Sequence, residues 1–199
     1  MYKTKILIAG VLLSVMPFIM AHAQRTPGTL SFGGFGGIGL PMKPSAFKDY
    51  WKMGIGFGGE LKYNFSEMSS FSASFTYLPF KLDQDAFKDL MTGMVPGMDV
   101  EISGGNIKTN IISANFLQYF TPPEASASLY FTAGGGYYMF KPGDVTLKIT
   151  YQGQTVYEGT QKVEESENGF GVNGGVGLEM TMGTNMFFFV EGKYHYTFV

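Results

Sequence analysis

A strict two-residue alternation over residues 53–65 constrains the fold more than any other feature of the sequence. Its odd positions are mostly large and apolar, and its even positions are polar or glycine: Met53, Ile55, Phe57, Gly59, Leu61, Tyr63 and Phe65 against Gly54, Gly56, Gly58, Glu60, Lys62 and Asn64. Side chains of a β-strand alternate between its two faces, so this segment predicts a strand with one apolar face. Strands of globular proteins average about 5–6 residues, whereas a membrane-crossing strand needs about 9–11. This segment is long enough to cross a bilayer.

The alternation recurs in six further segments, at residues 30–40, 71–80, 107–120, 129–140, 169–180 and 186–198. The connections 66–70, 121–128 and 181–185 are short, whereas 41–52, 81–106 and 141–168 are longer. Short periplasmic turns that alternate with longer extracellular loops are typical of outer-membrane barrels. We therefore predict an all-β, antiparallel up-and-down transmembrane barrel of the eight-strand type, with seven strands visible. Within the long loops we expect a hairpin around the turn at 152–154 and a short helix at 85–91.

The composition agrees with a sheet that has one face in lipid. Aromatic residues make up 16% of the chain and charged residues only 15%, against about 25% charged in typical soluble domains. The absence of cysteine excludes disulfides and thiolate metal sites. We expect no cofactor, and no basic block is present to bind nucleic acid.

The first 23 residues have the pattern of a secretory signal peptide. Lys3 and Lys5 precede an apolar run over residues 6–20, and Ala21-His22-Ala23 forms a small-x-small cleavage site. The run is too short for a membrane-spanning helix of about 20 residues. We expect a signal peptide at 1–23 and a barrel domain at 24–199. Removal of two lysines leaves 12 basic against 16 acidic residues, a net charge of −4.

Aromatic side chains gather where the predicted crossings end. Such positions predict two interfacial girdles, one beside the short turns and one beside the long loops or the chain end. The girdle residues are Phe65, Phe71 and Phe120 at the turns, and Trp51, Tyr77, Phe80, Tyr196 and Phe198 at the loops and end.

Six ionisable residues fall on the face that points away from lipid: Glu60, Lys62, Glu179, Glu191, Lys193 and His195. An isolated charge in a narrow lumen is costly, so these groups should pair into a polar network. An eight-strand barrel has little interior space beyond its own side chains, which favours a polar plug over a solute path or a proton-sensitive gate.

Two patterns in the sequence could indicate a specific chemical site, one for nucleotide binding and one for hydrolysis. Residues 34–39 and 54–59 match G-x-G-x-x-G, but the first leads into Pro41 and the second lies inside an alternating strand, so the strand-to-helix context of a dinucleotide site is missing. His195, Thr197 and Glu191 share a face and suggest a hydrolase that modifies lipid A. Their inward direction, away from a lipid substrate, argues against that function, and we expect no enzyme.

The stretches 112–120, 133–138, 171–179 and 191–198 resemble the outer-membrane β-barrel family that includes the opacity, OmpX-like and OmpA transmembrane domains. The resemblance covers nearly all of the mature chain and implies an outer-membrane location in a Gram-negative cell envelope. It also implies outer-membrane lipid, the barrel assembly machinery and periplasmic chaperones as partners. Bacterial members have an even number of strands, from eight upward. Because seven are visible, we expect a chain that lacks its last strand; the alternative is a mis-segmented glycine-rich first strand.

Two functions follow from this reading. The first is a structural, anchoring or surface-interaction barrel, whose loops 41–52, 81–106 and 141–168 meet a surface ligand. The alternative is a narrow, porin-like channel or transporter for small or apolar solutes.

Overall fold

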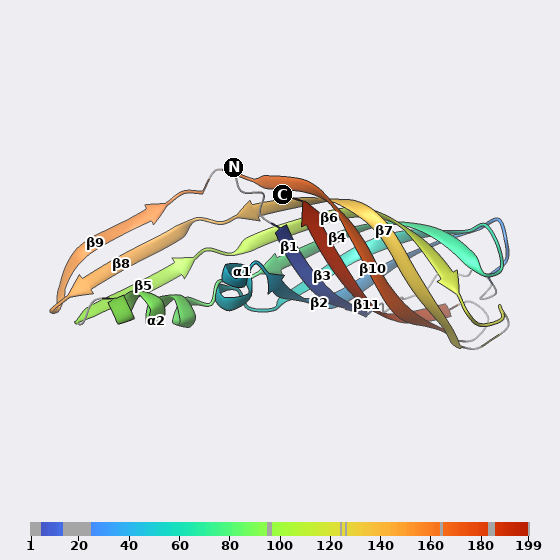
Figure 1. Ribbon diagram of the computed structural model, residues 1–199, viewed down its shortest axis with the longest axis horizontal. Helices are drawn as coiled ribbons and strands as arrows, with labels where there is room; N and C mark the ends of the chain where they lie inside the picture. The colour runs from blue at the N-terminus through green and yellow to red at the C-terminus, as the bar shows by residue number, and fades with distance from the viewer. Residues whose placement is uncertain are drawn as a thin grey trace.

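The computed structural model describes residues 5–13, 25–94, 97–123, 125, 127–163, 165–182 and 186–198. Eight strands form a closed antiparallel barrel, and three more form a sheet that projects beyond one end of it (Figure 1). We call this end of the barrel the loop end and the opposite end the turn end. Among the described residues, no helix is long and apolar enough to cross a membrane.

The seven predicted crossings are all present as barrel strands. Around the barrel the strands follow the order β1-β11-β10-β7-β6-β4-β3-β2. Their bounds are β1 Lys5–Leu13, β2 Thr29–Lys43, β3 Gly54–Asn64, β4 Ser69–Phe80, β6 Ile107–Tyr119, β7 Ala127–Pro142, β10 Glu167–Met182 and β11 Met186–Phe198. The predicted alternation is confirmed along them; in β3, for example, Ile55 and Phe57 are exposed on the outside and Lys62 is buried inside.

The eighth place in the barrel is filled from the N-terminus. β1 pairs antiparallel with β11 on one side and with β2 on the other. Since β2 and β11 run in the same direction, only a strand of opposite direction can pair antiparallel with both. The structure thus closes the ring that the seven predicted strands left open. β1 lies within the predicted signal peptide; the predicted cleavage after Ala23 falls outside the described residues and stays a prediction.

The long loops carry the structure that projects from the barrel. The second loop contains helix α2 (Gln84–Met94) and strand β5 (Met98–Gly104), and the third contains the hairpin of β8 (Val145–Tyr151) and β9 (Gln154–Gln161). The hairpin and the helix were predicted. β5 and the short helix α1 (Ser45–Tyr50) in the first loop were not. β5 pairs with β8, so the projecting sheet has the order β5-β8-β9. We call this sheet with α2 the platform.

Glycines allow close packing inside the barrel wall. A Cβ on Gly134 of β7 would collide with the backbone oxygen of Ala114 and with the Asn115 side chain of the neighbouring strand. On the outward-facing neighbour Gly135, the nearest atom is a backbone oxygen at 3.4 Å, which is an ordinary contact distance. The inward-facing glycines of the barrel strands therefore allow close packing of the wall.

Candidate functional site

The lumen near the turn end is filled by an ion pair between opposite walls. Lys62 of β3 and Glu179 of β10 meet with Nζ and Oε2 2.6 Å apart, and their side chains are 6% and 12% exposed. The Tyr119 hydroxyl lies 3.3 Å from Lys62 Nζ and donates to Glu179 Oε2 at 3.1 Å. These three groups bridge the barrel interior at one level.

A second ion pair lies beside the first. Lys193 and Glu191, two residues apart on β11, meet at 2.7 Å, and both side chains are about 95% buried. The Tyr130 hydroxyl donates to the other oxygen of Glu191 at 3.1 Å. Because each buried charge has an opposite charge beside it, and each pair also has a tyrosine hydroxyl partner, the cost of burial is largely offset.

Arg25 closes the turn end. Its guanidinium lies 4.0 Å from the centre of the Tyr119 ring, and Nη2 donates to the backbone oxygens of Thr121 and Pro122 at 2.8 and 3.0 Å. The cation thus packs on an aromatic face while it caps the β6–β7 turn. Arg25 is only 6% exposed.

An apolar cluster closes the loop end. α1 places Phe47 against Phe80, with ring centres 5.1 Å apart, and Trp51 packs on the same cluster. Ile111 and Tyr138 complete the contact from the barrel wall. Below this cluster, the Tyr138 hydroxyl and His195 Nδ1 are 2.8 Å apart, so His195 is held within the wall rather than presented to solvent.

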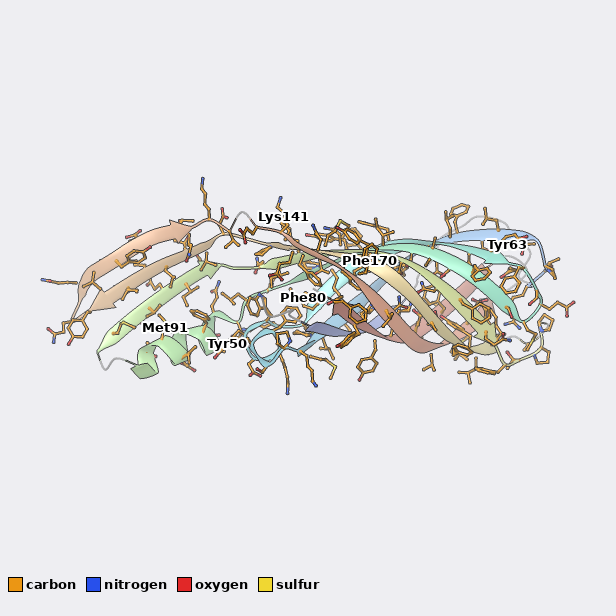
Figure 2. All side chains as sticks on the ribbon, turned by 45° about the horizontal axis from the view of Figure 1, so that its top comes forward. Tyr50, Tyr63, Phe80, Met91, Lys141 and Phe170 are labelled. Atoms are coloured by element: carbon orange, nitrogen blue, oxygen red, sulfur yellow. The ribbon has the colours of Figure 1, made fainter. Side chains whose placement is uncertain are left out.

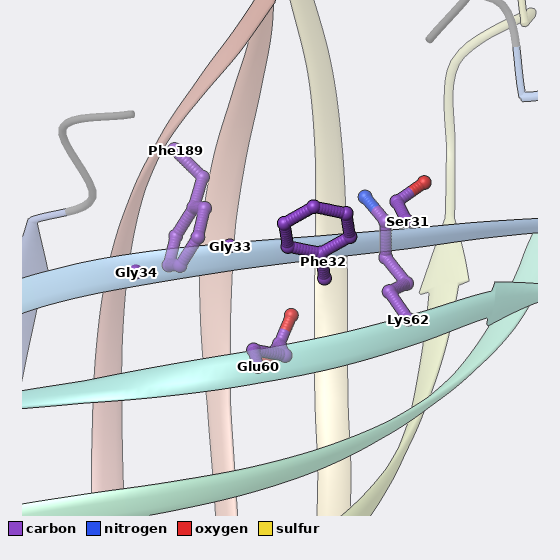
Figure 3. Close-up of a pocket in the computed structure, with 7 residues that line it drawn as sticks. All are labelled: Ser31, Phe32, Gly33, Gly34, Glu60, Lys62 and Phe189. Atoms are coloured by element: carbon purple, nitrogen blue, oxygen red, sulfur yellow. The ribbon is translucent and has the colours of Figure 1, made fainter. Parts of the chain in front are cut away.

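Glu60 stands apart from the pairs. Within the described part of the chain, it is in no ion pair or hydrogen bond of the network, although it lies next to Lys62 on the inward face of β3 (Figure 3). It borders a cavity of about 10 Å³ between β2, β3 and Phe189, which has room for one water molecule. The predicted network is therefore two ion pairs and a separate histidine contact, with Glu60 at its edge.

The predicted girdle positions divide into two groups. Phe65, Phe71, Phe120 and Phe198 are 40% to 57% exposed on the outside of the barrel, and Phe65 stacks on Phe71 at 4.8 Å. Tyr77 and Tyr196 also face outward, beside Phe57 and Phe198 respectively.

Phe80 and Trp51 do not belong to a lipid-facing girdle. Phe80 is fully buried, and it lies where the barrel passes into the platform (Figure 2). The Trp51 indole packs between the barrel and the platform and donates to the Gly105 backbone oxygen at 3.1 Å. The alternation in β4 already indicated an inward Phe80, since Ser72 and Leu78 share its face; its position near a crossing end was the misleading signal.

The suggested hydrolase constellation is not assembled. His195 Nδ1 contacts the Tyr138 hydroxyl, and both oxygens of Glu191 are held, one by Lys193 and the other by Tyr130, so Glu191 does not orient His195 as a triad carboxylate would. Three residues that shape the lumen were missed from the sequence: Tyr119, Tyr130 and Arg25. The alternation places Tyr119 and Tyr130 on the lumen-facing side of their strands, so these two could have been found. No pattern in the sequence indicated a role for Arg25.

The platform is built on its own apolar cluster. Leu82, Val100 and Ile102 are buried beneath α2, with Phe87 and Met91 packed against them. Lys88 of α2 pairs with Asp99 of β5 at 2.7 Å, and this bond lowers the pKa of Asp99 and raises that of Lys88. Asp83 accepts from the Ala86 backbone N–H at the start of α2, and this bond lowers the pKa of Asp83. The helix is thus fixed to the sheet by packing and by charge.

Comparison with known protein families shows to which family the chain belongs. The model of the outer membrane protein beta-barrel domain family matches residues 9–199. The chain belongs to this family. It is therefore an outer-membrane β-barrel protein, whose turn end is periplasmic and whose platform is extracellular in the usual arrangement of such barrels.

Two solved structures show a distant likeness to this barrel. One is Ail, the attachment invasion locus protein of Yersinia pestis, at 12% identity and a TM-score of 0.33, covering 100% of this chain and 99% of Ail. The other is the same protein in complex with the heparin analogue sucrose octasulfate, at 11% identity and a TM-score of 0.34 with the same coverage. At these TM-scores the two structures add nothing to the family match. No curated protein matches the chain.

Proposed function

We propose that this outer-membrane barrel is a sealed anchor that displays its platform for interaction with molecules at the cell surface. The observation that carries the proposal is the closure of the lumen at both ends. Arg25 on Tyr119 closes the periplasmic end, and the cluster around Phe47 and Phe80 closes the extracellular end. Between them, the two buried ion pairs occupy the interior. A lumen filled in this way supports an anchor rather than a solute path.

The charge of the extracellular loops limits the kind of surface ligand. Loops 41–52, 81–106 and 141–168 together contain eight lysines and eleven acidic residues, a net charge of −3. A polyanion would be repelled by most of this surface. We therefore propose a neutral or basic ligand for the platform.

Reconstitution in planar bilayers and in liposomes tests the sealed anchor. We expect no steady conductance and no swelling in small sugars for the full-length protein. A variant with Arg25, Tyr119, Lys62, Glu179, Phe47 and Phe80 all changed to alanine serves as the positive control, because it removes the closures at both ends and the ion pair between opposite walls and should therefore conduct. Steady conductance of the unmodified protein at the level of this variant would refute the proposal.

A second variant tests whether the platform is needed for the barrel. Replacement of residues 145–161 by a short turn removes β8 and β9 but leaves the barrel strands intact. We expect this variant to assemble in the outer membrane as well as the full chain, as judged by heat-modifiable migration in gels. Failure to assemble would assign the platform a folding role and contradict its role in display.

A further inference from the structure

Glu60 is an acidic residue of the lumen that has no opposite charge of its own. Lys62 pairs with Glu179 across the lumen, and this pair excludes Glu60. Lys193 pairs with Glu191 along β11 and excludes it too. A charged side chain inside a protein is normally paired or bound to a metal ion, because the loss of its hydration is costly. Glu60 therefore needs a partner that the described side chains do not supply.

The charges that surround Glu60 cancel one another. The charged groups that act on it most strongly are the four members of the two ion pairs. Two carboxylates and two ammonium groups have no net charge, so Glu60 carries the unbalanced negative charge of this part of the lumen. Arg25 does not balance it, because its guanidinium packs on Tyr119 at the turn end and donates to backbone oxygens. One added positive charge would make this part of the lumen neutral.

The cavity beside Glu60 has the size and the lining for one small ion. Its volume of about 10 Å³ suits a single water molecule or an ion of that size. The Glu60 carboxylate points toward β2, and Ser31 of β2 lines the same cavity, so two side chains with oxygen atoms border it (Figure 3). Lys62 also lines the cavity, but its Nζ lies 2.6 Å from Glu179, so its positive charge is already compensated.

We infer that this cavity binds one monovalent cation of the size of sodium, held by the Glu60 carboxylate and the Ser31 hydroxyl. Hard cations prefer such oxygen ligands. Gly33 and Gly34 line the cavity without side chains, which lets the β2 backbone approach the ion closely. A divalent ion fits less well, since no group of three or more acidic or histidine side chains in the described part of the chain is placed to hold a metal.

A water molecule is the alternative occupant of the cavity, beside a carboxyl group that carries no charge. The two occupants differ in how the stability of the barrel responds to salt. An ion that binds only the folded protein stabilises it more as the ion concentration rises, until the site is saturated. Bound water gives no such dependence on one particular cation.

Urea unfolding of the full-length protein from uncharged lipid vesicles tests the site. Sodium chloride is compared with choline chloride at equal ionic strength, so that general screening is the same in both. We expect the unfolding midpoint to rise with sodium to a plateau and to stay constant in choline. Glu60→Gln should abolish the sodium dependence, and Ser31→Ala should raise the sodium concentration of half effect about fivefold. Glu101→Gln, on the exposed platform, is the matched control and should respond like the unmodified protein.

Sodium-23 NMR gives a second readout that does not depend on unfolding. The sodium resonance should broaden in the presence of the unmodified protein and much less with Ser31→Ala, which also serves as the test if Glu60→Gln does not assemble. An equal response to sodium and choline, or a sodium dependence that persists in Glu60→Gln, would overturn the inference. Greater stability of Glu60→Gln in both salts, with no sodium dependence of the unmodified protein, would assign the cavity to water. The sealed anchor is tested separately, since steady conductance refutes it whatever sodium does.

Discussion

Removal of the Glu179 charge should destabilise the barrel strongly. In Glu179→Gln, Lys62 keeps its buried position and its contact with the Tyr119 hydroxyl but loses the carboxylate that lies 2.6 Å from its Nζ. Loss of one partner of a buried ion pair costs about 3–5 kcal/mol, because an uncompensated charge remains in a medium of low dielectric. Since Tyr119 still lies 3.3 Å from Lys62 Nζ, we expect the lower end of this range, about 3 kcal/mol. Such a loss is a large part of a typical stability of about 5–15 kcal/mol.

The double variant Lys62→Met/Glu179→Leu separates charge from packing. Replacement of both partners by apolar residues of similar size is often neutral or stabilising. It leaves the buried Tyr119 hydroxyl without the two groups it contacts, which costs about 1–3 kcal/mol, so we expect a loss of about 1–2 kcal/mol, smaller than that of Glu179→Gln. Urea unfolding from lipid vesicles, followed by far-ultraviolet circular dichroism, measures both variants. Glu101→Gln is the matched control, because its ion pair with Lys148 is exposed and should contribute little. If the double variant lost as much stability as Glu179→Gln, the burial argument would be refuted.

Two further predictions concern the wall and the platform. Gly134→Ala should destabilise the barrel by about 1–3 kcal/mol through overpacking, whereas the outward-facing Gly135→Ala should change little; equal effects in urea unfolding would contradict the packing account. The bond to Lys88 lowers the pKa of Asp99 below its ordinary value of 3.8. The ion pair therefore stabilises the docked helix α2 fully above pH 3.8, and this contribution is lost as the pH falls through the lowered pKa of Asp99. Trp51, the only tryptophan of the sequence, lies at the base of the platform and reports on helix undocking. Its fluorescence emission should therefore shift to longer wavelength at acid pH, and in Asp99→Asn this shift should begin at a higher pH. An identical pH profile in both proteins would show that the Lys88–Asp99 pair does not stabilise the docked helix.

The strands of the barrel could be predicted from the sequence because each strand has one face in lipid and the other in the lumen. This arrangement imposes the two-residue alternation, which is a local pattern and can therefore be recognised in the sequence alone. The same alternation indicated that Glu60 and Lys62 point inward. It could not indicate that Lys62 meets Glu179, since their contact across the lumen depends on how the ring closes.

The platform could be predicted only in part, because only its local elements leave a pattern in the sequence. The β8–β9 hairpin is local, and its turn at Gln152 and Gly153 was visible. β5 pairs instead with the distant β8, so its short alternation around Val100 and Ile102 had no local partner to mark it as a strand. α1 is six residues long and is held mainly by the contact of Phe47 with the barrel cluster. Elements that depend on tertiary packing leave a weak trace in sequence.

Site-specific labelling in intact cells tests most directly whether the barrel displays its platform outside. The chain contains no cysteine, so a single introduced thiol is the only target. The account predicts that Thr155→Cys on β9 reacts with a membrane-impermeant maleimide in intact cells. Glu67→Cys, in the exposed turn between β3 and β4, should react only after the outer membrane is permeabilised. Labelling of Glu67→Cys but not of Thr155→Cys in intact cells would contradict the account.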